Sequence, residues 1–289
     1  MLYFLLQPLA RDISVLNLLN YITFRATAAF VSALLVSFVF GPLIIRRLRE
    51  MAVHQVVRAG TPDSHAGKGT TPTMGGIIIL VATFIPVLLW ARLDNRYVLL
   101  AVAVTAWMGV IGFLDDYLKL KQKREGLKNE GLVERYKLAG QVICGLGLGT
   151  YLLLDPISTL PGASTTLPFF KYILVVPAVA WAAWLYIPWV TFILTGVSNA
   201  VNLTDGLDGL SSGLVAIAVL TLGIFAYLIG RVDTSAHLLI FYLRGAGELT
   251  VFCAAVVGAC IGFLWYNAHP AQVFMGDTGS LALGGAVGA

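Results

Sequence analysis

Two adjacent carboxylates, Asp115 and Asp116, follow an apolar run that begins near Tyr97, and lysines from Lys119 to Lys123 come directly after them. Carboxylates at the edge of a bilayer can hold a divalent cation or take a proton from a phosphate, and lysines can attract a polyanionic substrate. If the helix continues past the bilayer, Asp115, Lys119 and Lys123 recur at a spacing of four and share one face. The alternative is a helix end marked by interfacial charges and ion pairs.

The composition is that of a protein that crosses a membrane several times. Of the 289 residues, 58% are hydrophobic and only 12% are charged, and the mean hydropathy is +0.85. A soluble chain has about 25% charged residues. The apolar runs are continuous, which favours helices over the alternating strands of a barrel. We therefore expect an all-α, polytopic integral membrane protein, whose net charge of +4 reflects cytoplasmic loops rather than binding to nucleic acid.

Eight apolar runs predict eight helices in a single transmembrane domain that covers residues 1–289. The runs lie at about 21–45, 74–91, 97–114, 138–154, 172–194, 209–229, 249–266 and 281–289. The last run stops at Ala289, before a bilayer-spanning length is reached. We therefore expect that the C-terminal part of the domain is missing from this sequence.

The distribution of basic residues predicts which side of the membrane each loop faces. Twelve of the nineteen Lys and Arg residues belong to the loops after the first, third, fifth and seventh runs. The positive-inside rule puts these loops in the cytoplasm and the N-terminus outside. By the same parity Asp205, Asp208 and Asp277 gather on the cytoplasmic side with Asp115 and Asp116. Aspartates at membrane depth without lysine partners are costly unless a cation or substrate compensates them, so this convergence favours a functional site.

Two glycine-rich segments carry the other acids. In the first segment, Asp205 and Asp208 are each followed by glycine just before an apolar run, and either one could instead be an ordinary helix N-cap. The second segment contains Asp277 and Phe274, an aromatic residue that could stack on a nucleobase or lie at the membrane interface. The tetrapeptide Asp-Thr-Gly-Ser at Asp277 occurs once and at a helix start, which excludes aspartic-protease chemistry, since that requires two copies on β-structure.

The loop before the second apolar run could contact a diphosphate. Lys68 and several threonines, Thr73 among them, precede two glycines at a predicted helix N-terminus, where backbone amides bind anions. The segment is not a P-loop, because glycine stands at position 69, where that motif requires Ser or Thr. The alternative is a capped helix start with closely packed glycines.

Four segments together carry a family resemblance. They are Gly-Thr-Thr-Pro-Thr-Met-Gly-Gly at 69–76, Phe-Leu-Asp-Asp-Tyr at 113–117, Asn-Leu-Thr-Asp-Gly-Leu-Asp-Gly-Leu at 202–210 and Phe-Met-Gly-Asp-Thr-Gly-Ser at 274–280. In order, spacing and predicted side, the chain resembles the polyprenyl-phosphate N-acetylhexosamine-1-phosphate transferases over essentially its whole length. The threonine- and proline-rich first loop and the Asn-Leu-Thr-Asp segment favour their phospho-N-acetylmuramoyl-pentapeptide transferase branch.

The resemblance implies a reaction, a cofactor and a location. Phospho-MurNAc-pentapeptide would pass from UDP-MurNAc-pentapeptide to undecaprenyl phosphate, which yields lipid I and UMP for peptidoglycan and cell-wall biosynthesis. The cofactor would be Mg²⁺, and the enzyme would be a multi-pass homodimer in the bacterial inner membrane with its active site toward the cytoplasm. One-step attack and a route through a covalent aspartyl phosphate both remain open.

The resemblance also implies roles for individual residues. Asp115, Asp116 and Asp277 would be catalytic, Asp115 being the candidate base, and the metal ligands would be Asp277 and Asp116. The expected substrate-binding residues are Lys68, Thr73, Lys119 and Lys123 on the phosphate side and Asn202, Asp205, Asp208, Asn267 and Phe274 in the nucleoside pocket. Family members have about ten spans and a histidine cluster in a late cytoplasmic loop. This sequence contains no such cluster.

Two other functions compete with this interpretation. A sister transferase would use a different UDP-amino sugar on the same scaffold. A transporter of a polyprenyl-linked lipid would instead have acids within its spans and a repeated hydropathy pattern in its two halves. The predicted spans are nearly free of charge, which favours the enzyme.

Overall fold

The computed structural model describes residues 2–6, 8, 13–53, 71–124, 131–155, 165–166, 174–175 and 184–289. Short segments at the N-terminus are α1 (Leu2–Leu6) and the 3₁₀ helix η2 (Ser14–Asn20). The helices that follow are α2 (Ile22–Val53), α4 (Gly76–Trp90), α5 (Arg96–Arg124), α6 (Glu134–Leu154), α8 (Tyr186–Thr204), α9 (Leu210–Ile229), α10 (Val232–Leu238), η4 (Ala246–Glu248), α11 (Leu249–Asn267) and α12 (Gly276–Gly288). Strands β1 (Thr165–Thr166) and β2 (Leu174–Val175) form one antiparallel pair. The expectation of an all-α fold is confirmed.

The protein is a multi-pass membrane protein. Five of the described helices, α2, α5, α6, α9 and α11, are long and apolar enough to cross a bilayer, and α4 is equally apolar but shorter. The predicted helices at 21–45, 74–91, 97–114, 138–154, 209–229 and 249–266 correspond to α2, α4, α5, α6, α9 and α11. Helix α5 continues well beyond the acid pair, to Arg124.

The prediction for the fifth span, 172–194, is wrong in its placement. Residues 174–175 form strand β2, and helix α8 begins at Tyr186 and extends to Thr204, through a segment predicted to be a polar loop. The helix tolerates its polar residues because their side chains find partners nearby. Thr191 donates to the carbonyl of Ile187, and Asn199 exchanges hydrogen bonds with Gln141 on α6.

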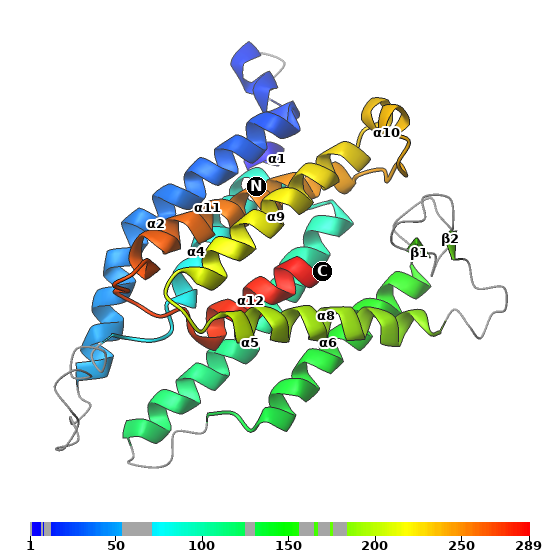
Figure 1. Ribbon diagram of the computed structural model, residues 1–289. Helices are drawn as coiled ribbons and strands as arrows, with labels where there is room; N and C mark the ends of the chain where they lie inside the picture. The colour runs from blue at the N-terminus through cyan, green and yellow to red at the C-terminus, as the bar shows by residue number, and fades with distance from the viewer. Residues whose placement is uncertain are drawn as a thin grey trace.

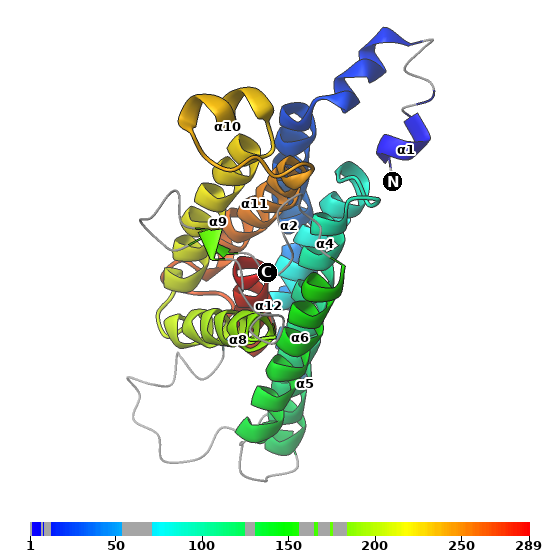
Figure 2. The same ribbon diagram turned by 90° about the vertical axis from the view of Figure 1, so that its right-hand side faces the viewer.

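The core is built around α11, and α12 lies in the middle of the molecule. Helix α11 is buried on nearly all sides, between α2, α4 and α9, as expected for a helix that is hydrophobic all round. Helix α12 packs against α5, α8 and α4, and Figure 1 shows it enclosed by these elements. The view in Figure 2 shows α8 passing beside it and α5 and α6 running side by side. Most residues of α12, from Thr278 to Gly285, are therefore buried.

A buried ion pair ties the far ends of three elements together. The guanidinium of Arg25 on α2 donates to both carboxylate oxygens of Glu248 in η4, at 2.6 and 2.7 Å. Arg25 also reaches the carbonyl of Trp90 at the end of α4, and its guanidinium lies over the ring of Tyr3. Both charged residues are buried, with 1% and 6% of their surfaces exposed.

Removing one member of this pair will destabilise the fold. Arg25→Leu leaves the Glu248 carboxylate buried without a partner, and we expect a loss of about 3–5 kcal/mol in the free energy of unfolding. The double variant Arg25→Leu/Glu248→Leu should recover most of that loss. Thermal unfolding in detergent tests this; equal losses in the single and double variants would contradict it.

Candidate active site

The start of α12 is held by backbone pairing with the segment before α4. The amides of Gly75 and Gly76 donate to the carbonyls of Phe274 and Met275, each at 2.8 Å, and the amide of Phe274 donates to the carbonyl of Pro72 at 2.9 Å. The two glycine-rich sequence motifs at 69–76 and 274–280 thus meet along the chain backbone. The motif at 69–76 therefore holds the backbone of the motif at 274–280 in place.

Two glycines allow α5 to lie directly against this start. Gly276 has a φ of +74°, in the left-handed region that glycine adopts without strain, and a Cβ there would meet the carboxylate of Asp116 at 2.7 Å. A Cβ at Gly112 would overlap the backbone of Asp277. The close approach brings the Asp115–Asp116 pair of α5 beside Asp277.

Asp115, Asp116 and Asp277 form one acid cluster. Each offers a carboxylate oxygen, and these atoms all lie within 4.8 Å of one another. Asp115 and Asp116 are only 2% and 4% exposed. The sequence predicted that these residues converge, and the structure brings them together.

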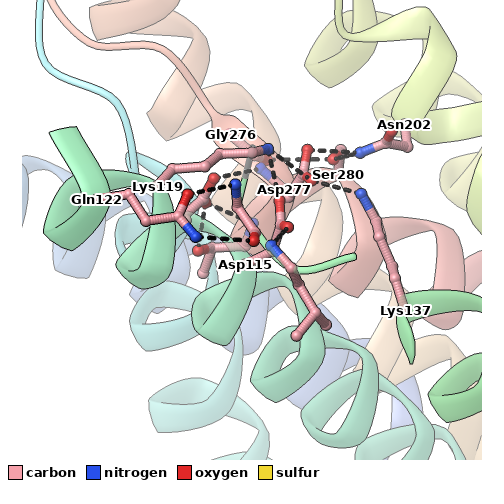
Figure 3. A network of polar contacts seen from close by, with 12 residues as sticks. Asp115, Lys119, Gln122, Lys137, Asn202, Gly276, Asp277 and Ser280 are labelled. Carbon is pink, nitrogen blue, oxygen red and sulfur yellow. Dashed lines mark hydrogen bonds and ion pairs between the residues drawn. The ribbon is translucent and has the colours of Figure 1, made fainter. Parts of the chain in front are cut away.

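Two lysines neutralise part of the charge of the acid cluster (Figure 3). Lys119 Nζ lies 2.5 Å from Asp115 Oδ2 and 3.1 Å from Asp277 Oδ2. Lys137 Nζ lies 2.5 Å from the same Asp277 oxygen. Three carboxylates against two ammonium groups leave the cluster with a formal charge of −1.

The acid cluster fits a hard divalent cation. Carboxylate oxygens are the protein ligands that Mg²⁺ prefers, and Mg²⁺ is usually held by one or two carboxylates together with substrate phosphates. Asp115 and Asp277 both direct an oxygen toward Lys119, so the two side chains already face a common positive charge. A divalent cation added to the formal charge of −1 would make the cluster attractive to a diphosphate.

Asn202, from the last turn of α8, orients Asp277. Its side-chain amide donates to Asp277 Oδ1 at 2.9 Å and to Ser280 Oγ at 2.8 Å. Burial disfavours the charge of Asp277, but its contacts with Asp115, Lys137 and Asn202 outweigh burial and lower the pKa of Asp277. Asp277 is therefore an ionised ligand or acceptor at neutral pH.

Asp205 lies at the end of α8, close to the same charges. Burial, followed by the negative charge of Asp277, raises the pKa of Asp205 to about 7, and the amide of Gly276 opposes this change. Asp205 is thus partly protonated at neutral pH, whereas Asp277 is ionised.

Asn267 and Asp208, two residues expected in a nucleoside pocket, make contacts that connect loops. The side chain of Asn267 is buried, accepts from the amide of Gly209 and donates to the carbonyl of Val273, both at 3.0 Å. Asp208 lies 3.1 Å from a ring nitrogen of His269. These contacts join the start of α9 to the segment between α11 and α12.

Thr73 and Phe274 are the other predicted site residues that the structure describes. Thr73 is exposed, and Phe274 is half-buried beside Gly75. Lys68 and the side chain of Lys123 lie outside the described residues.

The sequence analysis missed Lys137 as a site residue. Lys137 lies in the first turn of α6, and it is one of several basic residues between the third and fourth apolar runs. Its position on the predicted cytoplasmic side was the available signal. Nothing in the sequence separated it from Lys121 or Arg135.

Comparison with known proteins identifies the relatives of this chain. Residues 97–289 match the model of glycosyl transferase family 4. The whole chain is 90% identical to the phospho-N-acetylmuramoyl-pentapeptide-transferase of Gemmatimonas aurantiaca and spans 76% of that protein. It is 48% and 49% identical to the enzymes of the same name from Geobacter sp. strain M21 and Pelobacter propionicus, and spans 77% of each.

The chain belongs to the phospho-N-acetylmuramoyl-pentapeptide transferase family. The resemblance seen in the four sequence motifs is confirmed. It is a membrane enzyme of the phosphoglycosyl transferase class, and all four motifs meet at the acid cluster or at the start of α12.

Loss of the Lys137 charge will impair the transferase. Lys137→Gln removes one of the two ammonium groups at Asp277, and we expect phosphosugar transfer to fall by about tenfold or more, because electrostatic stabilisation of a phosphoryl group depends on such cations. Arg135→Gln removes a positive charge from the same turn of α6, two residues before Lys137, and should leave the rate within about twofold. Equal rates for both variants would contradict this.

The pKa of Asp205 predicts a pH dependence of stability. Because the folded protein binds this proton more tightly than the unfolded chain, the free energy of unfolding should fall as pH rises from about 4 to about 7. Asp205→Asn should flatten that slope in thermal unfolding with a chelator present. Asp233→Asn is the control, since the pKa of exposed Asp233 is lowered to about 2, below this range. A slope unchanged by Asp205→Asn would contradict the prediction.

Proposed function

We propose that this transferase moves phospho-MurNAc-pentapeptide from UDP-MurNAc-pentapeptide to undecaprenyl phosphate, forming lipid I and UMP in peptidoglycan biosynthesis. The observation that carries the proposal is the acid cluster with its two lysines, in a chain 90% identical to a protein of that name. An oxygen of the lipid phosphate forms a bond to the β-phosphorus of the nucleotide sugar. The bond from that phosphorus to the bridging oxygen breaks, and UMP leaves with the electron pair.

Asp115 is the proposed base for the lipid phosphate. Its Oδ1 accepts the amide of Leu132 at 2.8 Å, which fixes the carboxylate, and Oδ2 faces Lys119. A proton taken from the lipid phosphate would pass to the Asp115 carboxylate and neutralise its negative charge. The positive charge of Lys119 would then be free to interact with the phosphate. General base catalysis of this kind contributes about 10²–10⁴-fold to a rate.

Lys119 and Lys137 would stabilise the charge of the transferred phosphoryl group. Both ammonium groups contact Asp277 Oδ2. Each ammonium has three hydrogens, more than these carboxylate contacts use, so each could also donate to a phosphate oxygen. In phosphoryl transfer the protein contributes mainly positioning and charge stabilisation. These lysines provide both.

Asp277 is the proposed Mg²⁺ ligand, with Asp115 and Asp116 adjoining. When bound, Mg²⁺ would neutralise the diphosphate and polarise its β-phosphoryl group. Asn202 holds one Asp277 oxygen, so the other is the oxygen that points toward the lysines and the incoming phosphates.

The remaining roles follow the family. Phe274 would stack on uracil, and Asp205, Asp208 and Asn267 would border the nucleoside. The nucleotide substrate is cytoplasmic, so the acid cluster would face the cytoplasm from the inner membrane. The enzyme would act as a homodimer.

Release of UMP tests the proposal. The chain, with any sequence that follows it in the gene, is purified in detergent and supplied with Mg²⁺, undecaprenyl phosphate and UDP-MurNAc-pentapeptide. We expect Asp277→Asn to abolish release and Asp115→Asn to lower it by about 10²-fold or more. Asp233→Asn on α10, an exposed residue paired with Arg231, is the matched control and should match the parent.

The same assay separates the alternatives. Release from UDP-N-acetylglucosamine but not from UDP-MurNAc-pentapeptide would identify a sister transferase. The proposal would be overturned if neither nucleotide gave release, or if Asp277→Asn left release unaffected. Lipid transport would then be the hypothesis to test.

A further inference from the structure

Helix α12 cannot cap its own N-terminus. The residue at its N-cap position is Met275, whose side chain makes no capping hydrogen bond. A helix start leaves amides without partners inside the helix, and Ser, Thr, Asp or Asn normally accepts from them. Two residues of this start, Met275 and Thr278, are each 0% exposed. The amide of Thr278 is therefore shielded from bulk water and needs a partner within the protein.

Asp116 of α5 supplies the missing cap. Its Oδ1 accepts the amide of Asp277 at 3.2 Å, and its Oδ2 accepts the amide of Thr278 at 2.8 Å. The Thr278 hydroxyl donates to Oδ2 as well, at 2.7 Å. Both oxygens are thus occupied by the first turn of α12, and the negative charge lies at the positive end of that helix.

The neighbouring acid has different partners. Adjacent residues on a helix point about 100° apart. Asp115 faces Lys119 and the amide of Leu132, whereas Asp116 faces α12. Among the described residues, the ion pairs of the acid cluster involve Asp115 and Asp277, and none involves Asp116.

From these contacts we infer that Asp116 is a positioning residue, whose carboxylate caps α12 from another helix and thereby sets the orientation of Asp277. This positioning role differs from the metal-ligand role expected for Asp116 from the sequence. The inference rests on the proposed function only for the role of Asp277 in metal binding and transfer. Asp277 lies in the capped turn, so its backbone direction depends on the hydrogen bond to Asp116. Asn202 and Lys137 can hold the Asp277 carboxylate only where that turn presents it.

Thr278 offers a way to disturb the cap without touching the metal or substrate. Its hydroxyl contacts Asp116 and is fully buried, so Thr278→Val alters the cap alone, and Thr278→Ser restores the donor. Asp116→Asn replaces one acceptor oxygen by an amide that cannot accept. Thr221→Val on α9 is the matched control, because the exposed Thr221 hydroxyl bonds only within its own helix.

The first measurement is thermal unfolding of the metal-free protein in detergent with a chelator. We expect Asp116→Asn to lower the midpoint by about 2–4 °C, as loss of a helix cap does in a chain of this size. Thr278→Val should lower it by less, and the double variant should fall short of the sum of the two. Thr278→Ser and Thr221→Val should match the parent. An unchanged midpoint in Asp116→Asn would overturn the cap.

The second measurement is Mn²⁺ affinity of the same variants by electron paramagnetic resonance. A residue that positions a ligand typically changes metal affinity by about tenfold. We expect Asp116→Asn to weaken Mn²⁺ binding by about that factor, Thr278→Val to weaken it by a smaller factor, and Thr278→Ser to restore it. Complete loss of binding in Asp116→Asn with parent-like binding in Thr278→Val would make Asp116 a direct ligand and overturn the inference. A parent protein that binds no Mn²⁺ would contradict the proposed metal site, while the unfolding experiment would still decide the cap.

Discussion

The structure depends on one constraint, which is that the start of α12 is buried and must have all of its polar groups satisfied by other elements. The segment before α4 pairs with it through backbone hydrogen bonds, α5 provides the carboxylate of Asp116, and α8 provides the amide of Asn202. Unpaired amides in an apolar interior cost several kcal/mol, so these partners are needed for the helix to form there. The same contacts that satisfy the helix start also hold Asp277.

The carboxylate of Asp277 is held by three helices. Asp277 has one oxygen bound by Asn202 and the other by Lys119 and Lys137. Because these partners come from α8, α5 and α6, the geometry of the site is lost if any of the three helices shifts. A site assembled from long helices is more rigid than one built on loops, which suits chemistry that relies on positioning.

Charge is distributed unevenly between the two ends of the helices. At one end, Arg25 and Glu248 form a closed pair, with both oxygens of the carboxylate occupied by one guanidinium. At the other end, three carboxylates are shared between two lysines and retain a formal charge of −1. The first arrangement is complete without a ligand, whereas the second has charge left for one. This contrast distinguishes a structural ion pair from a site for a cation and an anionic substrate.

The sequence by itself determined the fold class, most of the helices and the convergence of Asp115, Asp116 and Asp277, because hydropathy and membrane side are local properties of the chain. Its motifs also identified the family. The tertiary structure decided which partner each acid has, since adjacent residues on one helix face different neighbours. It added Lys137 and extended α8 to Thr204, where polar side chains find partners on α6 and α12 that no local pattern reveals.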